Sequence, residues 1–123
     1  MTRLKGLSLF ANVGIAETYL KSCNIDIVVA NEINETRAKF YSHLYPEVNM
    51  IVGDITDSSI FDIIVKESNK KNVDFLIATP PCQGMSLAGK RNTYDERNQL
   101  IFYAVEMIKK LKPKYVMLEN VPQ

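Results

Sequence analysis

A thiol stands directly after two prolines, in the stretch Pro80-Pro81-Cys82. The prolines fix the backbone angle φ and narrow the directions in which the Cys82 side chain can point. An oriented thiol that gains thiolate character is a nucleophile that can form a covalent intermediate. The other cysteine, Cys23, lies at the expected end of a helix, and we interpret it as structural or inert. The sequence therefore predicts Cys82 as the candidate nucleophile.

Two carboxylates and one turn have the spacing of a nucleoside pocket. The turn runs through Phe10-Ala11-Asn12-Val13-Gly14-Ile15, and Gly14 allows its backbone N–H groups to approach a ligand closely. Glu32 follows Gly14 by 18 positions and could accept hydrogen bonds from both ribose hydroxyls. Asp54 could accept one from an adenine amino group, and the next residues in sequence, Ile33 and Ile55, could sandwich the base.

Each carboxylate alone also fits a solvated strand end or a helix cap, but the pair together with the turn favours a nucleotide-like ligand. The turn has one glycine where the G-x-G-x-x-G pattern of dinucleotide enzymes has three. This disfavours a pyrophosphate ligand and a nicotinamide dehydrogenase. It favours a smaller nucleoside such as S-adenosylmethionine.

The elements that must position these residues alternate between strand and helix. Apolar runs predict strands at 7–10, 25–30, 50–52, 73–78 and 115–118, and helical spacing predicts helices at 13–21, 34–44, from 57 or 58, and at 95–111. This order predicts an α/β fold, a parallel sheet with helices on both faces. Ligands of such sheets bind at the carboxyl ends of the strands, which is where the unusual residues fall.

Length and composition limit the function classes. The 123 residues predict a single domain over 1–123, and no apolar run approaches a membrane span. No signal peptide is expected, so the predicted location is the cytoplasm of a bacterium, with access to its DNA, or the nucleus of a eukaryote. Two cysteines make no zinc site, and no metal is expected. The net charge of +1 means that any DNA contact depends on local basic groups.

Four ordered motifs resemble the cytosine-C5 DNA methyltransferases. They are Phe10-Ala11-Asn12-Val13-Gly14, Pro80-Pro81-Cys82-Gln83-Gly84-Met85-Ser86, Asp95-Glu96-Arg97-Asn98-Gln99-Leu100 and Glu119-Asn120-Val121. The resemblance covers essentially the whole chain, and its Pro-Pro-Cys-Gln and Glu-Asn-Val elements are specific. It implies the first half of a Rossmann-like, S-adenosylmethionine-dependent methyltransferase domain, truncated after the fifth strand.

The resemblance also implies a mechanism. Cys82 would attack C6 of a cytosine flipped out of the duplex, and the resulting enamine would take the methyl group at C5. Glu119 would hold or protonate N3, and Asn120 would fix the loop around Glu119. The cofactor contacts would be those of the turn and the strand ends, with Pro81 and Leu100 added. Candidate nucleic-acid contacts are Gln83, Ser86, Lys90, Arg91 and Arg97.

The sequence departs from the family pattern in two ways. Asn12 replaces a usual glycine but tolerates left-handed φ, and Ile15 is expected to crowd the methionine end of the cofactor. The chain ends at Gln123, so the target recognition domain is expected to be absent and the chain alone to be inactive. A C-terminal half in a second polypeptide would complete it. A tRNA cytosine-C5 methyltransferase and a non-catalytic subunit that binds the cofactor or a partner chain remain open alternatives.

Overall fold

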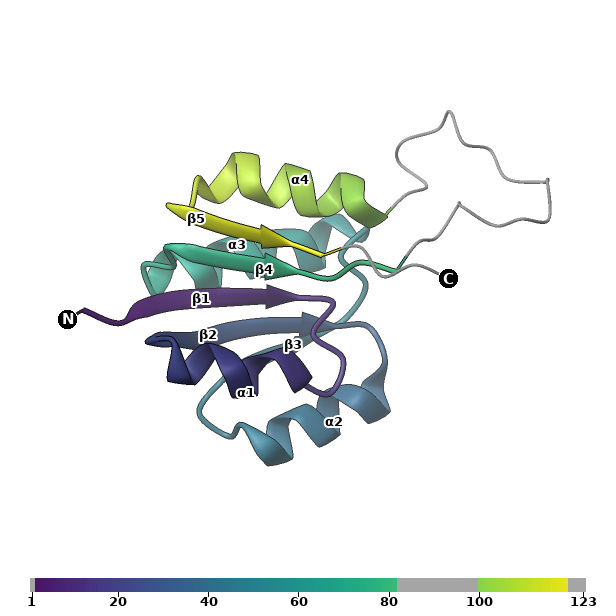
Figure 1. The fold of residues 1–123 in the computed structure, drawn as a ribbon. Helices are drawn as coiled ribbons and strands as arrows, with labels where there is room; N and C mark the ends of the chain where they lie inside the picture. Colours follow the sequence, from purple (N-terminus) through teal and green to yellow (C-terminus); the bar gives the residue numbers. More distant parts are fainter. Residues whose placement is uncertain (1, 82–99, 120–123) are drawn as a thin grey trace.

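Five parallel strands form one sheet in the computed structural model, which describes residues 2–81 and 100–119 (Figure 1). The elements are β1 (Leu4–Leu9), α1 (Ile15–Ser22), β2 (Ile25–Glu32), α2 (Glu35–Leu44), β3 (Asn49–Val52), α3 (Ser58–Lys70), β4 (Phe75–Ala78), α4 (Leu100–Leu111) and β5 (Tyr115–Leu118). The strand order is β3-β2-β1-β4-β5, and every neighbouring pair is parallel. The order reverses between β1 and β4, so a crevice for ligands is expected at their carboxyl ends.

Helices cover both faces of the sheet, as the alternation of elements predicted (Figure 1). On one face α3 and α4 pack on a core that includes Leu7, Leu9 and Leu76. On the other face α1 and α2 pack on a second core that includes Ile27 and Phe75. Neighbouring strand residues such as Phe75 and Leu76 point to opposite faces, so the central strands β1, β2 and β4 are buried on both sides.

Local signals set the element boundaries close to the predicted ones. Asn34 caps α2 by accepting a hydrogen bond from the N–H of Arg37 at 3.0 Å, and Asp57 caps α3 through the N–H of Ser59 at 2.9 Å. Strand β1 ends at Leu9, one residue before the predicted end, because Phe10 has a φ of 57°. The predicted start of the last helix, residues 95–99, lies outside the described residues.

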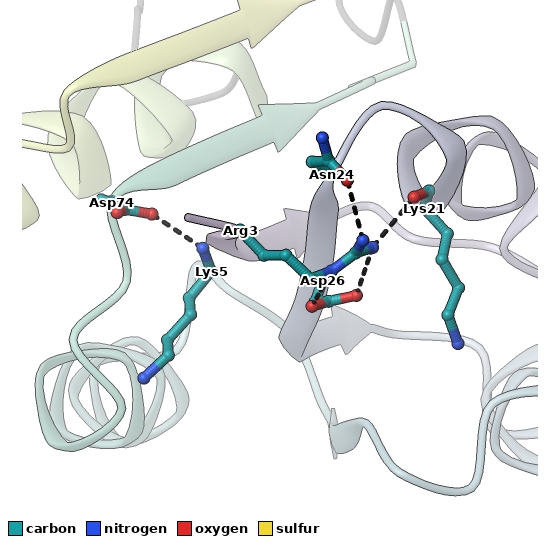
Figure 2. Close-up of polar contacts among 6 residues, drawn as sticks. All are labelled: Arg3, Lys5, Lys21, Asn24, Asp26 and Asp74. Atoms are coloured by element: carbon teal, nitrogen blue, oxygen red, sulfur yellow. Dashed lines mark hydrogen bonds and ion pairs between the residues drawn. The ribbon is translucent and has the colours of Figure 1, made fainter. Parts of the chain in front are cut away.

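Polar contacts join three strands at the amino ends of the sheet. Figure 2 shows the Arg3 guanidinium donating two hydrogen bonds to the Asp26 carboxylate, at 2.6 and 2.9 Å, and one to Asn24. The hydrogen bond from Arg3 lowers the pKa of Asp26 below its usual range. The N–H of Lys5 donates to Asp74 at 2.8 Å. These contacts hold β1 against β2 and the start of β4, at the opposite end of the sheet from its carboxyl edge.

Strand β5 is the outer strand of the described sheet and pairs only with β4 there. All four of its side chains are exposed, from 42% at Val116 to 56% at Tyr115. An apolar sheet edge exposed in this way is a surface able to pair with further chain. No helix in the described ranges has the length and apolar content needed to cross a membrane.

Candidate functional site

A cavity of about 890 Å³ opens at the carboxyl ends of the strands. Its volume lies within the range of small-molecule sites. Eight of the residues predicted to contact a cofactor line it: Phe10, Asn12, Glu32, Ile33, Asp54, Ile55, Pro81 and Leu100. The structure therefore brings together residues from the ends of β1 to β4 and from the start of α4.

Glu32 is buried at the end of β2, with 5% of its surface exposed. Its Oε1 accepts a hydrogen bond from the N–H of Asn12 at 2.7 Å, and its Oε2 accepts one from the N–H of Asn34 at 2.9 Å. A carboxylate oxygen has two lone pairs, so each oxygen can accept a second hydrogen bond from a ligand hydroxyl. Glu32 thus fixes the turn after β1 and presents acceptors to the cavity.

The turn after β1 contains three residues with left-handed backbone. Phe10, Asn12 and Gly14 have φ values of 57°, 55° and 82°. The φ of Asn12 confirms that asparagine takes the left-handed conformation here, whereas the sequence did not predict that of Phe10. Such angles cost a non-glycine residue about 1–2 kcal/mol, so the contacts around the turn must hold it.

The end of β3 is held to β2 by a buried asparagine. Asn31 Nδ2 donates to the carbonyl oxygens of Ile51 and Gly53, at 2.8 and 3.0 Å. Asp54 Oδ1 accepts hydrogen bonds from both the N–H and the hydroxyl of Thr56, at 2.9 and 2.8 Å. Asp54 therefore shapes its own turn with one oxygen. Its other oxygen accepts no hydrogen bond from the described residues.

Six further residues line the cavity and were not predicted as ligand contacts: Asn31, Arg37, Gly53, Thr56, Thr79 and Tyr103. One had a usable signal, because Tyr103 follows Leu100 by three residues on a helix. Asn31 is a polar residue inside an apolar strand, beside Glu32 in sequence. The Thr79 hydroxyl donates to the carbonyl of Phe10 at 3.3 Å, a contact between residues 69 positions apart that no local pattern predicts.

Four residues of the predicted turn do not line this cavity. Ala11 is buried in the core between α1, α2 and the sheet. Val13, Gly14 and Ile15 line a separate groove of about 230 Å³ between α1 and α2. Ile15 is the first residue of α1 and is 73% exposed in that groove, and its expected crowding of the methionine end of a cofactor stays a prediction. Contact of these residues with a cofactor stays a prediction that concerns the backbone of the turn.

The predicted catalytic groups are only partly described. Glu119 directly follows β5 and is exposed. Its backbone N–H donates to the carbonyl of Ala78 at 3.0 Å, which places Glu119 beside the end of β4. The residues Cys82, Gln83, Ser86, Lys90, Arg91, Arg97 and Asn120 lie outside the described residues. The convergence of Cys82 and Glu119 therefore stays a prediction. Cys23 is exposed at the C-terminal end of α1.

Comparison with known proteins gives the family. The sequence model of the family of C-5 cytosine-specific DNA methylases matches residues 4–123. The chain belongs to this family. The methylase chain is 50% identical to the type II methyltransferase M1.HgaI of Avibacterium volantium over 97% of its own length, and 33% identical to M.XorII of Xanthomonas oryzae pv. oryzae over 98%. It covers 35% and 29% of these two relatives, so it spans about a third of their length.

Solved structures share the fold of the methylase chain. A DNMT2 variant from Spodoptera frugiperda superposes with a TM-score of 0.70 at 28% identity, over 96% of this chain and 35% of that one. A protein encoded within an E. coli prophage, and named for DNA modification, gives 0.75 at 27% identity, over 97% and 32%. The five-stranded sheet and its four helices are therefore the N-terminal part of the methyltransferase fold.

A second carboxylate of the methylase chain lies buried behind the turn. Glu17, in the first turn of α1, is 6% exposed and accepts a hydrogen bond from the Tyr41 hydroxyl at 2.6 Å. Burial raises the pKa of Glu17 above its usual value, against the opposing effect of hydrogen bonds from Tyr41 and Ser8. Burial and the neighbouring carboxylate raise the pKa of Tyr41, so its hydroxyl stays a proton donor.

We expect Glu17→Gln to become more stable relative to the natural chain as pH rises. The raised pKa means that folded Glu17 holds its proton at pH values where unfolded Glu17 has lost it. Stability therefore falls as pH rises from about 4.5 through the raised pKa. Glutamine removes this titration and still accepts from Tyr41. The difference in melting temperature between Glu17→Gln and the natural chain is measured from about pH 5 to about pH 8. Glu35→Gln, an exposed change on α2, is the control. A difference in melting temperature that stays constant or shrinks as pH rises contradicts the expectation.

Proposed function

We propose that this chain binds S-adenosylmethionine in the cavity and carries the nucleophile for methylation of cytosine at C5 in DNA. The observation that carries the proposal is buried Glu32, which faces the cavity and holds the turn after β1 in a chain of the C-5 cytosine-specific methylase family. Two of its relatives are type II methyltransferases, and the chain spans about a third of each. Catalysis by this chain alone is not expected.

The cavity fits the nucleoside half of the cofactor. Glu32 would accept hydrogen bonds from the ribose hydroxyls, and Asp54 would accept one from the adenine amino group. Ile33, which is 63% exposed, and buried Ile55 would cover the two faces of the base. Leu100 and Pro81 close the cavity on the side of β4 and α4. When bound, S-adenosylmethionine supplies an electrophilic methyl group on its sulfonium.

The chain's own residues perform the steps at the cytosine ring. The Cys82 thiolate adds to C6, and the electron pair of the C5–C6 bond makes C5 nucleophilic enough to take the methyl group. Glu119 hydrogen-bonds or protonates N3, which removes negative charge from the ring as the thiolate adds. Loss of the C5 proton and departure of the Cys82 thiolate restore the ring. Asn120 holds the segment that carries Glu119.

The nucleic acid contacts are proposed for the segment between β4 and α4. Gln83, Ser86, Lys90, Arg91 and Arg97 fall there, and their amide, hydroxyl and cationic groups are the types that bind phosphates and bases. We assign the remaining contacts, and the closure of the site, to polypeptide outside this sequence. That polypeptide is either a second chain or another part of one longer protein.

Cofactor binding to the purified chain tests the proposal directly. Isothermal titration with S-adenosylmethionine is expected to give saturable binding at one site, and NAD is expected not to bind. NAD is the informative comparison because its pyrophosphate requires the glycine-rich turn that this chain lacks. Binding of neither compound contradicts the proposed function and favours a module that only binds a partner chain.

We expect Glu32→Gln to weaken S-adenosylmethionine binding about tenfold or more. Glutamine presents an NH2 group to one of the two backbone N–H donors that the carboxylate now satisfies, so one hydrogen bond to the turn or to α2 is lost. It also removes a charged acceptor for the ribose, and hydrogen bonds to charged groups contribute about 1.5–3 kcal/mol. The dissociation constant is compared with that of the exposed variant Glu35→Gln. Equal affinities for all three chains would show that Glu32 is not at the ligand.

A further inference from the structure

The turn after β1 is held from behind by Tyr41 of α2 and by Tyr45, the residue that follows this helix. The Tyr45 hydroxyl donates to the carbonyl oxygen of Gly14 at 2.7 Å, across 31 positions of sequence. Thr18 Oγ1 lies 3.0 Å from the same hydroxyl and donates to it, since the Tyr45 proton is directed to Gly14. The rings of Tyr41 and Tyr45 pack against each other with centroids 5.0 Å apart.

These rings lie directly against the turn. A Cβ added at Gly14 would come within 2.5 Å of Tyr45 Cε2 and 2.9 Å of two ring carbons of Tyr41. Tyr41 is fully buried, and its hydroxyl is fixed on Glu17 of α1. The tyrosines therefore fix both the position of Gly14 and the start of α1.

The same turn is held from the cavity side by Glu32. A continuous chain of contacts thus runs from the Tyr45 hydroxyl to the Gly14 carbonyl, through the turn to the N–H of Asn12, and on to Glu32 Oε1. Because the turn includes left-handed residues other than glycine, its shape depends on the contacts at both ends.

We infer that Tyr45 is a positioning residue for the cofactor site: by holding the Gly14 carbonyl, its hydroxyl keeps the turn in the shape in which Glu32 faces the ligand. The inference rests on the proposed function for the identity of the ligand. Tyr45 lines the groove behind the turn and not the cavity, so it acts through the turn. Tyr41 and Glu17 support it by fixing α2 against α1.

The first test needs no ligand. Tyr45→Phe keeps the ring packing and removes one oxygen, so the fold is expected to remain. Hydrogen exchange of the Asn12 amide is expected to rise about three- to tenfold, the effect of losing one hydrogen bond, while amides in the middle of α3 keep their rates. Tyr19→Phe is the matched control, since it makes the same change on the neighbouring helix at a residue that is 70% exposed. An unchanged rate at Asn12 overturns the inference.

The second test measures the ligand at a temperature where every variant is folded. Tyr45→Phe is expected to raise the dissociation constant of S-adenosylmethionine about three- to tenfold, and Tyr19→Phe to leave it unchanged. If the natural chain binds and Tyr45→Phe binds equally well, the hydroxyl is merely structural and the inference is wrong. Failure of the natural chain to bind overturns the proposed function instead, and the exchange rates then still decide whether Tyr45 holds the turn.

Discussion

Gly14→Ala is expected to destabilise the chain by roughly 2–5 kcal/mol and to abolish measurable cofactor binding. Two costs add. An alanine at a φ of 82° pays about 1–2 kcal/mol for the left-handed backbone, and its Cβ would lie 2.5 Å from a ring carbon of Tyr45. Overpacking of this kind costs a further 1–3 kcal/mol or so. Both costs fall on the turn that Glu32 holds, so the site is disturbed together with the fold.

Thermal or urea unfolding measures the first part of this result, and titration with S-adenosylmethionine the second. The double variant Gly14→Ala with Tyr45→Ala, compared with Tyr45→Ala alone, separates the two costs, because it removes the nearer of the two rings that the new Cβ would meet but leaves φ unchanged. In that comparison the alanine at position 14 should keep the backbone cost and lose part of the contact cost. A Gly14→Ala chain within about 0.5 kcal/mol of the natural one would mean that the turn is not packed against α2 as described.

The positions of the strands and helices could be predicted because their signals are local. Alternating apolar runs and helical spacing predicted the order of the nine elements among the described residues, and Asn34 and Asp57, which cap α2 and α3, lie at predicted helix starts. The strand ends Glu32 and Asp54 could be assigned to one edge because parallel strands bring their carboxyl ends together. Among the eight predicted residues that line the cavity, those at the strand ends follow from this same rule, whereas Leu100, at the start of α4, came from the resemblance to the family.

The remaining features of the site depend on tertiary contacts. Glu32 was expected to meet a ligand, and nothing local indicated that it also holds the N–H of Asn12, 20 positions earlier. Nothing local indicated that Tyr41 and Tyr45, in and just after α2, contact the turn after β1. Ile15 was assigned to the ligand from its place in a motif, and that its side chain lines the groove between α1 and α2 follows only from the packing of these helices. Sequence spacing predicts which end of a strand a residue occupies, and packing decides what it touches.

Cys82→Ser is expected to lower methyl transfer by three orders of magnitude or more. A serine hydroxyl ionises far less readily than a thiol and is a weaker nucleophile towards C6, so the covalent step fails while the pocket stays intact. Because the isolated chain is not expected to turn over, the assay uses a chimera in which residues 4–123 replace the matching third of M1.HgaI, with which they share 50% identity. Transfer of labelled methyl groups to cytosine-containing DNA is the readout.

The control for this experiment is the same atom exchange at the other cysteine. Cys23→Ser changes an exposed thiol at the end of α1, beside the amino ends of the strands, and should keep full activity. Both variants should bind S-adenosylmethionine as the parent chimera does, because neither thiol belongs to the residues that hold the nucleoside. If the Cys82→Ser chimera methylates normally, Cys82 is not the nucleophile, and the proposed cofactor site is unaffected. One that loses both binding and activity would instead show that Cys82 shapes the pocket, because a nucleophile that only attacks cytosine leaves cofactor affinity unchanged.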